Sequence, residues 1–247
     1  MGLALARGKG IAVEFEKIFL EPDIFYWTWR DVDFLPYAWL EEHDLKKLPL
    51  PFYLQDIHPD SPVGFPAEGE ESKTNEILLP PSFEELGLTA DLRKDLRRVE
   101  KKNSSTRIVA NEKNSLEKAS KWFLELWGEE PAEFKRRMLV WKGAFTLSAY
   151  GGEKLLGVHI SLPAQNGIQY LGCWWDRSNK SLSIPTFLLK KDVERVISLG
   201  LSFYDLGIGS EAYKKEWGVL ERQSKYYAAV QKPLAQKLGL KHFAEIP

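Results

Sequence analysis

Residues 204–218 read YDLGIGSEAYKKEWG, and this stretch carries the most informative pattern in the chain. An alternating apolar run over residues 201–206 predicts a strand, and two glycines break the chain directly behind Asp205. The pair Tyr213 and Lys214 follows within reach of the same strand end. Because loops at strand ends commonly carry functional side chains, we predict a site here.

The overall composition is that of an ordinary soluble globular protein. The chain has 247 residues, of which 44% are hydrophobic and 28% are charged. Its single cysteine, Cys173, excludes an internal disulfide and fits a reducing compartment, so we expect a cytoplasmic protein. No segment approaches the roughly 18 uninterrupted apolar residues of a membrane span, so none is expected. Residues 1–9 are too short and wrongly ordered for a signal peptide.

Charge is divided unevenly along the chain. Residues 1–90 carry 7 Lys and Arg against 17 Asp and Glu, whereas residues 91–247 carry 27 against 18. This asymmetry suggests that the second part faces something anionic. The alternative is that the two parts complement each other within one protein, and both interpretations stay open.

The first part of the chain is rich in aromatic residues and prolines. Residues 24–28 and 52–57 have the β-branched and aromatic content of strands, and residues 36–43 predict a short helix between them. Residues 58–73 are rich in Pro, Gly, Ser and Glu, which predicts an exposed loop. We expect the aromatic side chains to form core, although exposed ones would make a binding platform.

A basic amphipathic helix is predicted from residue 88 to residue 102, after a strand over residues 75–79. Its apolar residues are spaced by four, four and three, and therefore share one face: Leu88, Leu92, Leu96 and Val99. The other faces hold Arg93, Lys94, Arg97, Arg98, Lys101 and Lys102. Arg97, Arg98 and Lys101 could contact a phosphate-rich donor, whereas the alternative is a solvated charged face.

After the basic helix, the sequence predicts a strand, two helices, three strands linked by hairpin turns, a long helix and two further strands. Glycine turns at 151–152 and 166–167 separate three of the predicted strands, and Ser183 and Gly200 are expected to cap the longest helix. The pattern predicts strands over 106–110, 144–150, 154–162, 167–174, 201–206 and 220–230, and helices over 114–127, 131–141 and 184–199.

This order of elements resembles the GNAT acyltransferase fold, and several motifs resemble its BioF2-like acetyltransferase and FemAB families over residues 75–230. The motifs are the basic helix 91–102, Leu156-Gly157, Asp176, Ser183-Ile184-Pro185, Gly200, Tyr204-Asp205-Leu206-Gly207, Tyr213-Lys214 and Trp217-Gly218. The resemblance implies an α/β (α+β) fold with a mixed, mainly antiparallel sheet flanked by helices. Residues 88–247 would form the GNAT-like domain, and residues 1–87 a strand-rich extension or reduced first GNAT-like half packed on it.

The resemblance also implies a function. Members of these families move an acyl or aminoacyl group to an amine, taking it from acyl-CoA or from aminoacyl-tRNA. We therefore expect an N-acyltransferase that uses acyl-CoA, such as acetyl-CoA, as donor and a small-molecule, peptide or amino-sugar amine as acceptor. Two alternatives stay open: FemAB-like aminoacyl transfer from aminoacyl-tRNA, and a catalytically inert GNAT-like module that binds an anionic ligand.

One segment departs from the pattern of ordinary GNAT enzymes, which hold the CoA pyrophosphate with a Gly-rich run before the long helix. Here residues 177–185 read RSNKSLSIP, without glycine. Backbone amides cannot then approach a phosphate in the usual way. The helix start at Ser181, Ser183 and Thr186 could still bind an anion through its amides.

Four residues are candidates for catalysis. The resemblance places Lys214 at the family's functional lysine, where it could stabilise negative charge at the donor carbonyl; a solvated lysine at a helix start is the alternative. Tyr213 could donate a proton or orient Lys214, or it could simply pack. Asp205 could act as a base, but we favour a role in ordering the following loop. Asp176 could position the acceptor amine or cap the polar loop that it opens.

Histidine and cysteine chemistry is not indicated by the sequence. His159 lies in an apolar strand and is expected to be a satisfied core histidine, and Cys173 has no neighbouring histidine to act as a base. The four histidines show no spacing typical of metal ligands, so no metal site is predicted.

Overall fold

The structure, a computed structural model, describes residues 5–8, 11–14, 16–21, 24–28, 42, 52–57, 59–68, 73–127, 144–164, 166–209, 211–237 and 239–246. The chain forms two compact units. One unit comprises residues 1–74 and 221–247, and the other comprises residues 75–220.

A seven-stranded sheet has the strand order β13-β7-β12-β11-β10-β9-β8, and all of its strands except β13 lie wholly or mainly in the second unit. Neighbours pair antiparallel from β8 to β11, whereas β11 and β12 pair parallel. This confirms the predicted mixed, mainly antiparallel sheet. The strands are β7 (Lys73–Leu78), β8 (Arg107–Ala110), β9 (Phe145–Gly151), β10 (Lys154–Ala164), β11 (Gly167–Trp175), β12 (Phe203–Ile208) and β13 (Leu220–Gln223).

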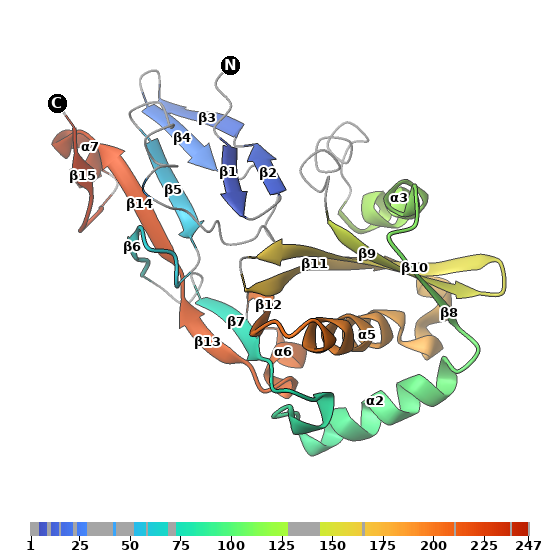
Figure 1. Ribbon diagram of the computed structural model, residues 1–247. Coiled ribbons are helices and arrows are strands. Elements are labelled where there is room, and N and C mark those ends of the chain that lie inside the picture. Colours follow the sequence, from blue (N-terminus) through green and yellow to red (C-terminus); the bar gives the residue numbers. More distant parts are fainter. Residues whose placement is uncertain are drawn as a thin grey trace. The chain divides into compact units, whose positions relative to one another are not determined.

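Helices cover both faces of this sheet. Figure 1 shows α3 (Ser115–Trp127) on one face and α5 (Ile184–Ser198) on the other, with α2 (Ala90–Lys102) packed against α5. Consecutive residues of the central strand β10, from Leu156 to Leu162, are all buried. A strand that is buried on both faces loses the alternation of polar and apolar residues, and β10 shows this pattern.

Helix α2 forms where the leucine spacing predicts it. Thr89 accepts a hydrogen bond from the Leu92 amide at 3.2 Å and thereby caps the helix. Leu92, Leu96 and Val99 are buried, and Leu92 and Leu96 join a core cluster with residues of α5, β11 and β12. The basic residues Lys94, Arg97, Arg98, Lys101 and Lys102 are exposed, as the amphipathic pattern requires, whereas Arg93 is half-buried.

The first unit consists mainly of strands. Two hairpins pair β1 (Leu5–Gly8) with β2 (Ile11–Glu14) and β3 (Glu16–Glu21) with β4 (Ile24–Thr28). A further sheet has the order β15-β14-β5, with β6 paired to β14. Its strands are β5 (Phe52–Ile57), β6 (Phe65–Pro66), β14 (Lys225–Val230) and β15 (Ala244–Glu245), and α7 (Lys232–Lys237) follows β14.

The compact units divide at different residues from the predicted boundary between residues 87 and 88. Strand β7 belongs to the seven-stranded sheet, and β14 pairs antiparallel with β5, which precedes it by about 170 residues. The predicted strand over 220–230 is two strands, β13 and β14, separated at Ser224. Such long-range strand pairings are not encoded in local periodicity.

The remaining predicted elements have mixed outcomes. The strands predicted over 24–28 and 52–57 match β4 and β5, and those over 144–150 and 154–162 match β9 and β10 within two residues. The segment 177–182 was expected to be a loop but forms a 3-10 helix, η3. The helix over 131–141 lies outside the described residues, as does that over 36–43 except for Glu42.

We predict that Gly157→Ala destabilises the protein by about 1–3 kcal/mol, because its backbone is packed tightly. A Cβ at Gly157 would lie 2.7 Å from Cγ2 of Ile184 and 3.0 Å from Cβ of Trp175. Urea denaturation measures the loss of unfolding free energy. Gly87→Ala is the control, because its Cβ would meet nothing within 4 Å and the change should stay within about 0.5 kcal/mol. Equal stability of the two variants would contradict this packing.

Candidate active site

The strands β11 and β12 pair over a short distance and then part. Their parallel register joins Gly167 to Phe203, Ile168 to Tyr204, and Gln169 to Asp205. Strand β11 nevertheless continues to Trp175 and β12 to Ile208. The register between β10 and β11 shifts at the same place, because Ser161 pairs with Tyr170 and Ile160 with Gly172, which leaves Leu171 as an extra residue. Such a bulge bends a strand, and here it turns β11 away from β12.

A cavity of about 370 Å³ lies beside this opening. Its walls come from α2, from the first turns of α5, from β11, and from α6 (Ala212–Glu216) with the residue that follows it. The lining residues are Leu92, Asp95, Arg98, Val99, Tyr170, Ser183, Pro185, Thr186, Leu189, Tyr213, Glu216 and Trp217. Of the ten predicted site residues, the structure brings four together here: Arg98, Ser183, Thr186 and Tyr213.

The start of α5 is fixed by the end of α2. Lys102 donates from Nζ to the carbonyl of Ser181 at 2.9 Å, and Asn103 donates from Nδ2 to the carbonyl of Leu182 at 2.7 Å. Ser183 then adopts a left-handed conformation, with φ of 51°. Its side chain makes no capping hydrogen bond, which differs from the expected cap. The first turn of α5 therefore faces the cavity without a side-chain cap, and such a turn can bind an anion through its amides.

The basic helix contributes less charge to the cavity than the sequence predicts. Arg98 lines the cavity and pairs with Asp95, from Nη2 to Oδ1 at 3.1 Å. Arg97 and Lys101 are exposed and do not line it. Because Asp95 and Glu216 also line the cavity, two carboxylates there face one guanidinium.

Two tyrosine side chains, Tyr213 and Tyr170, line the cavity. Burial raises the pKa of Tyr213, and the nearby Glu211 carboxylate adds to this effect. Burial also raises the pKa of Tyr170 well above its usual value, with further contributions from Cys173, Tyr213 and Glu211. Both hydroxyls therefore stay protonated at neutral pH and can donate hydrogen bonds.

The predicted residues Lys214 and Asp205 lie in the turn behind β12 and do not line the cavity. Asp205 accepts a hydrogen bond at Oδ1 from the Gly207 amide at 2.7 Å, as expected for a residue that orders the loop. Lys214 is 1% exposed; its Nζ donates to the Gly207 carbonyl at 3.2 Å and pairs with Glu211 at 2.9 Å. These contacts hold the turn that leads into α6 and thus place the neighbouring Tyr213.

The contacts of Asp176 are those of a helix cap. It accepts hydrogen bonds from the amide and hydroxyl of Ser178 and from Nδ2 of Asn179, and it pairs with Lys154 at 2.7 Å. The hydrogen bonds from Lys154 and Ser178 hold the pKa of Asp176 well below its usual range. The carboxylate therefore opens η3, and it does not line the cavity.

Sequence reasoning missed four polar residues at or near this site: Tyr170, Asp95, Glu216 and Asn75. Tyr170 looks like a core aromatic residue, because nothing local marks the end of the β11–β12 pairing. Asp95 and Glu216 lie among basic residues, so the local sequence indicates positive charge at both places. Asn75, which is buried, donates from Nδ2 to the carbonyls of Gly207 and Gly209 at 2.9 and 2.8 Å. No signal near Asn75 in the sequence indicates this long-range contact.

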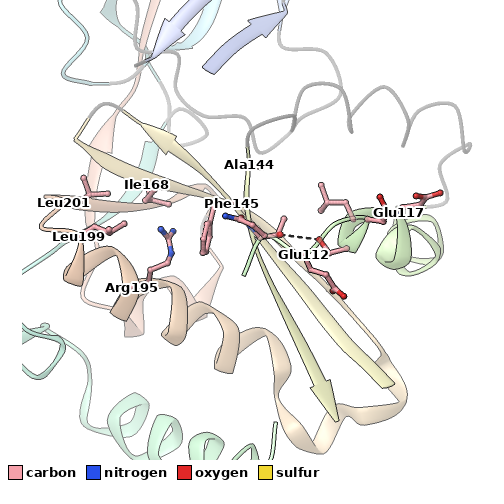
Figure 2. Close-up of a pocket in the computed structure, with 13 residues that line it drawn as sticks. Glu112, Glu117, Ala144, Phe145, Ile168, Arg195, Leu199 and Leu201 are labelled. Atoms are coloured by element: carbon pink, nitrogen blue, oxygen red, sulfur yellow. Dashed lines mark hydrogen bonds between the residues drawn. The ribbon is translucent and has the colours of Figure 1, made fainter. Parts of the chain in front are cut away.

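A second cavity, of about 660 Å³, lies at the other end of α5. Figure 2 shows Arg195, Leu199 and Leu201 gathered there, with Phe145 between them and two acids, Glu112 before α3 and Glu117 in its first turn. Its lining is completed by Asn111, Asn114, Ser115, Leu116, Ala144, Thr146 and Ile168. None of the predicted site residues lines this cavity.

Across the parts of the chain that the structure describes, no group of three or more His, Cys, Asp or Glu side chains could hold a metal ion. Burial raises the pKa of the Cys173 thiol, so a reactive thiolate is not favoured. Among those same residues, no helix combines the length and the apolar character needed to cross a membrane.

Comparison of the sequence with models of protein families identifies the family to which the chain belongs. The family model described as an acetyltransferase (GNAT) domain matches residues 89–215, and the chain belongs to this family. The match begins at the cap of α2 and ends directly after Lys214, so it includes the parted strands and all of the predicted site residues. A search of curated proteins finds no match.

Solved structures with the same fold come from proteins of very different sequence. FemX aligns with a TM-score of 0.64 and 11% identity, over 96% of this chain and 90% of that chain. L-PGS from Bacillus licheniformis aligns with a TM-score of 0.57 and 10% identity, over 87% and 79%. The C-terminal domain of a putative lysylphosphatidylglycerol synthetase from Agrobacterium fabrum aligns with a TM-score of 0.52 and 12% identity, over 71% and 66%. At such identities the likeness concerns the fold alone.

We predict that Asn75→Ala lowers the free energy of unfolding by about 1–3 kcal/mol, because the carbonyls of Gly207 and Gly209 each lose a hydrogen bond from Asn75. Urea denaturation measures this loss. The control is Asn166→Ala, which removes an exposed hydrogen bond to the Ser202 hydroxyl and should cost less than about 0.5 kcal/mol. If Asn75→Ala is as stable as the control, Asn75 does not hold the turn.

Proposed function

We propose that this chain transfers an acyl group to an amine, and that the acyl end of the donor lies in the cavity between α2, α5 and α6. The observation that carries the proposal is the early end of the β11–β12 pairing, beside which the cavity lies. An unpaired stretch of strand offers backbone donors and acceptors to a ligand. Two protonated tyrosines and an uncapped helix start line the same cavity.

The reaction is a substitution at the donor carbonyl. The lone pair of the neutral amine attacks the carbonyl carbon, so that a C–N bond forms and the bond to the leaving sulfur or oxygen breaks. Tyr213 gives its proton to the leaving group. The proton that the attacking nitrogen loses passes to solvent, from which Tyr213 is reprotonated. Because burial raises its pKa, Tyr213 carries its proton at neutral pH, and it gives this proton more readily to a leaving oxygen than to a leaving sulfur, since an alkoxide is the stronger base.

In this scheme Lys214 and Asp205 are positioning residues for the turn behind β12. Lys214 donates to the Gly207 carbonyl and Asp205 accepts from the Gly207 amide, so both fix one peptide segment. The catalytic role that the family resemblance implies for Lys214 stays a prediction. The Nζ atom would first have to leave Gly207 and Glu211 to reach a substrate.

The first candidate donor is acyl-CoA, such as acetyl-CoA. The first turn of α5, with Ser183 and Thr186, would receive its phosphate groups, and Arg98 would contact them from α2. Membership of the acetyltransferase (GNAT) domain family supports this donor.

The second candidate donor is an aminoacyl-tRNA, and the charge of the cavity favours it. Asp95 and Glu216 outnumber Arg98, so the cavity suits an aminoacyl group, which carries an ammonium, better than an uncharged acetyl group. The absence of glycine from residues 177–185 points the same way. The likeness to FemX and to a putative lysylphosphatidylglycerol synthetase agrees with this candidate.

Binding measurements with both donors test the proposal. If acyl-CoA is the donor, acetyl-CoA at millimolar concentration raises the melting temperature, and Arg98→Ala reduces the shift. Arg97→Ala is the matched control, because Arg97 is exposed on the same helix and lies outside the cavity. If aminoacyl-tRNA is the donor, the protein retains tRNA with an affinity that falls as salt rises. Binding of either donor without any transferred product supports the inert module instead, and binding of neither contradicts the proposed function.

We predict that Tyr213→Phe lowers kcat by about 10²-fold, because the leaving group loses its proton donor. The KM of the donor should change little, since the ring remains in the cavity wall. Steady-state kinetics with the donor identified above measures both constants. Tyr227→Phe, in the other compact unit, is the control and should keep wild-type kinetics. An unchanged kcat in Tyr213→Phe would remove Tyr213 from the mechanism.

A further inference from the structure

We propose that Tyr170 is a second catalytic tyrosine, whose hydroxyl hydrogen-bonds the carbonyl oxygen of the acyl donor, and that buried His159 is the positioning residue that holds its ring. This inference rests on the proposed function, and it adds the group that stabilises the carbonyl oxygen. Buried polar side chains, His159 and Asp192, lie behind Tyr170 at positions that apolar side chains could fill.

Tyr170 lies where the two parallel strands part. It follows Gln169, the last residue of β11 that pairs with β12, and it precedes the bulge at Leu171. Its side chain lines the cavity together with Tyr213 from α6. Two tyrosines from different elements therefore line one cavity, and we assign the Tyr170 hydroxyl to the carbonyl oxygen and the Tyr213 hydroxyl to the leaving group.

The ring of Tyr170 packs on the ring of His159. Their centroids lie 5.0 Å apart and their planes are inclined by 28°, which is a stacked arrangement. His159 is fully buried and comes from the neighbouring strand β10. The orientation of the tyrosine ring therefore depends on what fixes the imidazole.

Hydrogen bonds fix the imidazole through one nitrogen. Nε2 of His159 lies 3.1 Å from Oδ2 of Asp192 and 2.9 Å from the hydroxyl of Tyr204. The Tyr204 hydroxyl donates to the same Oδ2 at 2.8 Å. Since both neighbours offer acceptor oxygens, Nε2 carries the hydrogen. Nδ1 has no hydrogen-bond partner among the described residues, so the imidazole is held through Nε2 alone.

Asp192 joins this group to α5. Arg195 donates from Nε to Oδ1 of Asp192 at 2.7 Å, and its guanidinium carbon lies 3.5 Å from the centroid of the Phe145 ring. Figure 2 shows Arg195 beside Phe145 at the wall of the second cavity. Burial alone would raise the pKa of Asp192, but His159 and Arg195 outweigh it and hold the pKa well below its usual range. A buried carboxylate with these partners is a rigid anchor for the imidazole.

Burying a hydrogen-bonded carboxylate, imidazole and phenol in the core costs desolvation free energy, and this cost argues for a role beyond packing. Asp192, His159 and Tyr204 are each fully buried, and an apolar trio of similar volume would avoid the desolvation of a charged group. What the polar group supplies is a fixed direction for the imidazole, and through it for the Tyr170 ring. No bond to Tyr170 forms or breaks in the reaction; its hydroxyl only donates a hydrogen bond as charge develops on the carbonyl oxygen.

Kinetics of single and double variants test both parts of the proposal. Tyr170→Phe should lower kcat about 10²-fold with little change in donor KM, as expected when one donor to a developing oxyanion is removed. His159→Gln keeps an N–H near the place of Nε2 but loses the stacked ring, and should lower kcat about tenfold. In the double variant the second substitution should add nothing, because His159 acts only through the Tyr170 hydroxyl. His242→Gln is the control, since His242 also stacks on an aromatic ring, Phe65, but in the other unit.

Two results would overturn the proposal: wild-type kcat in Tyr170→Phe, or effects of the two substitutions that multiply in the double variant. NMR tests the positioning role of His159 without turnover, and so separates failure of this proposal from failure of the proposed function. With ¹³C-labelled tyrosine and ¹⁵N-labelled histidine, we expect a hydrogen on Nε2 of His159 and a Tyr170 signal that moves in His159→Gln and in Tyr204→Phe. If the chemical shift of Tyr170 is the same in wild type and in both variants, the positioning role of His159 is refuted, even if no donor supports turnover.

Discussion

Beyond Gln169, strand β11 stays hydrogen-bonded to β10 and is no longer paired with β12. The site depends on this separation of β11 from β12. The bulge at Leu171 keeps β11 paired with β10 up to Trp175, so its hydrogen bonds to β12 end after three positions. A continuous sheet would have no opening between the two strands. Because the pairing stops, β12 is free to turn at Gly207 and to carry α6 to the cavity wall, and Tyr170 is left beside the opening.

Two buried groups of polar residues support this opening from either side. Behind β12, Asn75, Asp205 and Lys214 all bond to the peptide units around Gly207 and so set the start of α6. Behind β11, His159 and Asp192 lie beneath Tyr170. Neither group lines the cavity, yet each fixes a tyrosine that does. The chemistry of the site is therefore concentrated in uncharged hydroxyls held by buried charged residues.

The sequence predicted elements better than it predicted contacts. Helix α2, helix α5 and the strands from β9 to β12 follow from periodicity, turn glycines and caps, which are local properties. Arg98, Ser183, Thr186 and Tyr213 were predicted for the site and do line the cavity. Lys214 and Tyr213 are adjacent in sequence, but one is buried and the other lines the cavity, because a helical turn points neighbours in different directions. Tyr170 and Asn75 act through strand pairing and long-range hydrogen bonds, which local patterns do not report.

The central claim is that the acyl donor binds where β11 and β12 part, and chemical-shift mapping tests it most directly. Acetyl-CoA and aminoacyl-tRNA would be titrated in turn into ¹⁵N-labelled protein while backbone amide shifts are recorded. The account predicts that one of them shifts the amides of Leu171, Gly172 and Thr186 and leaves those around Phe145 and Leu199 in place. Shifts confined to the second cavity at the end of α5, or no shift with either donor, would contradict it.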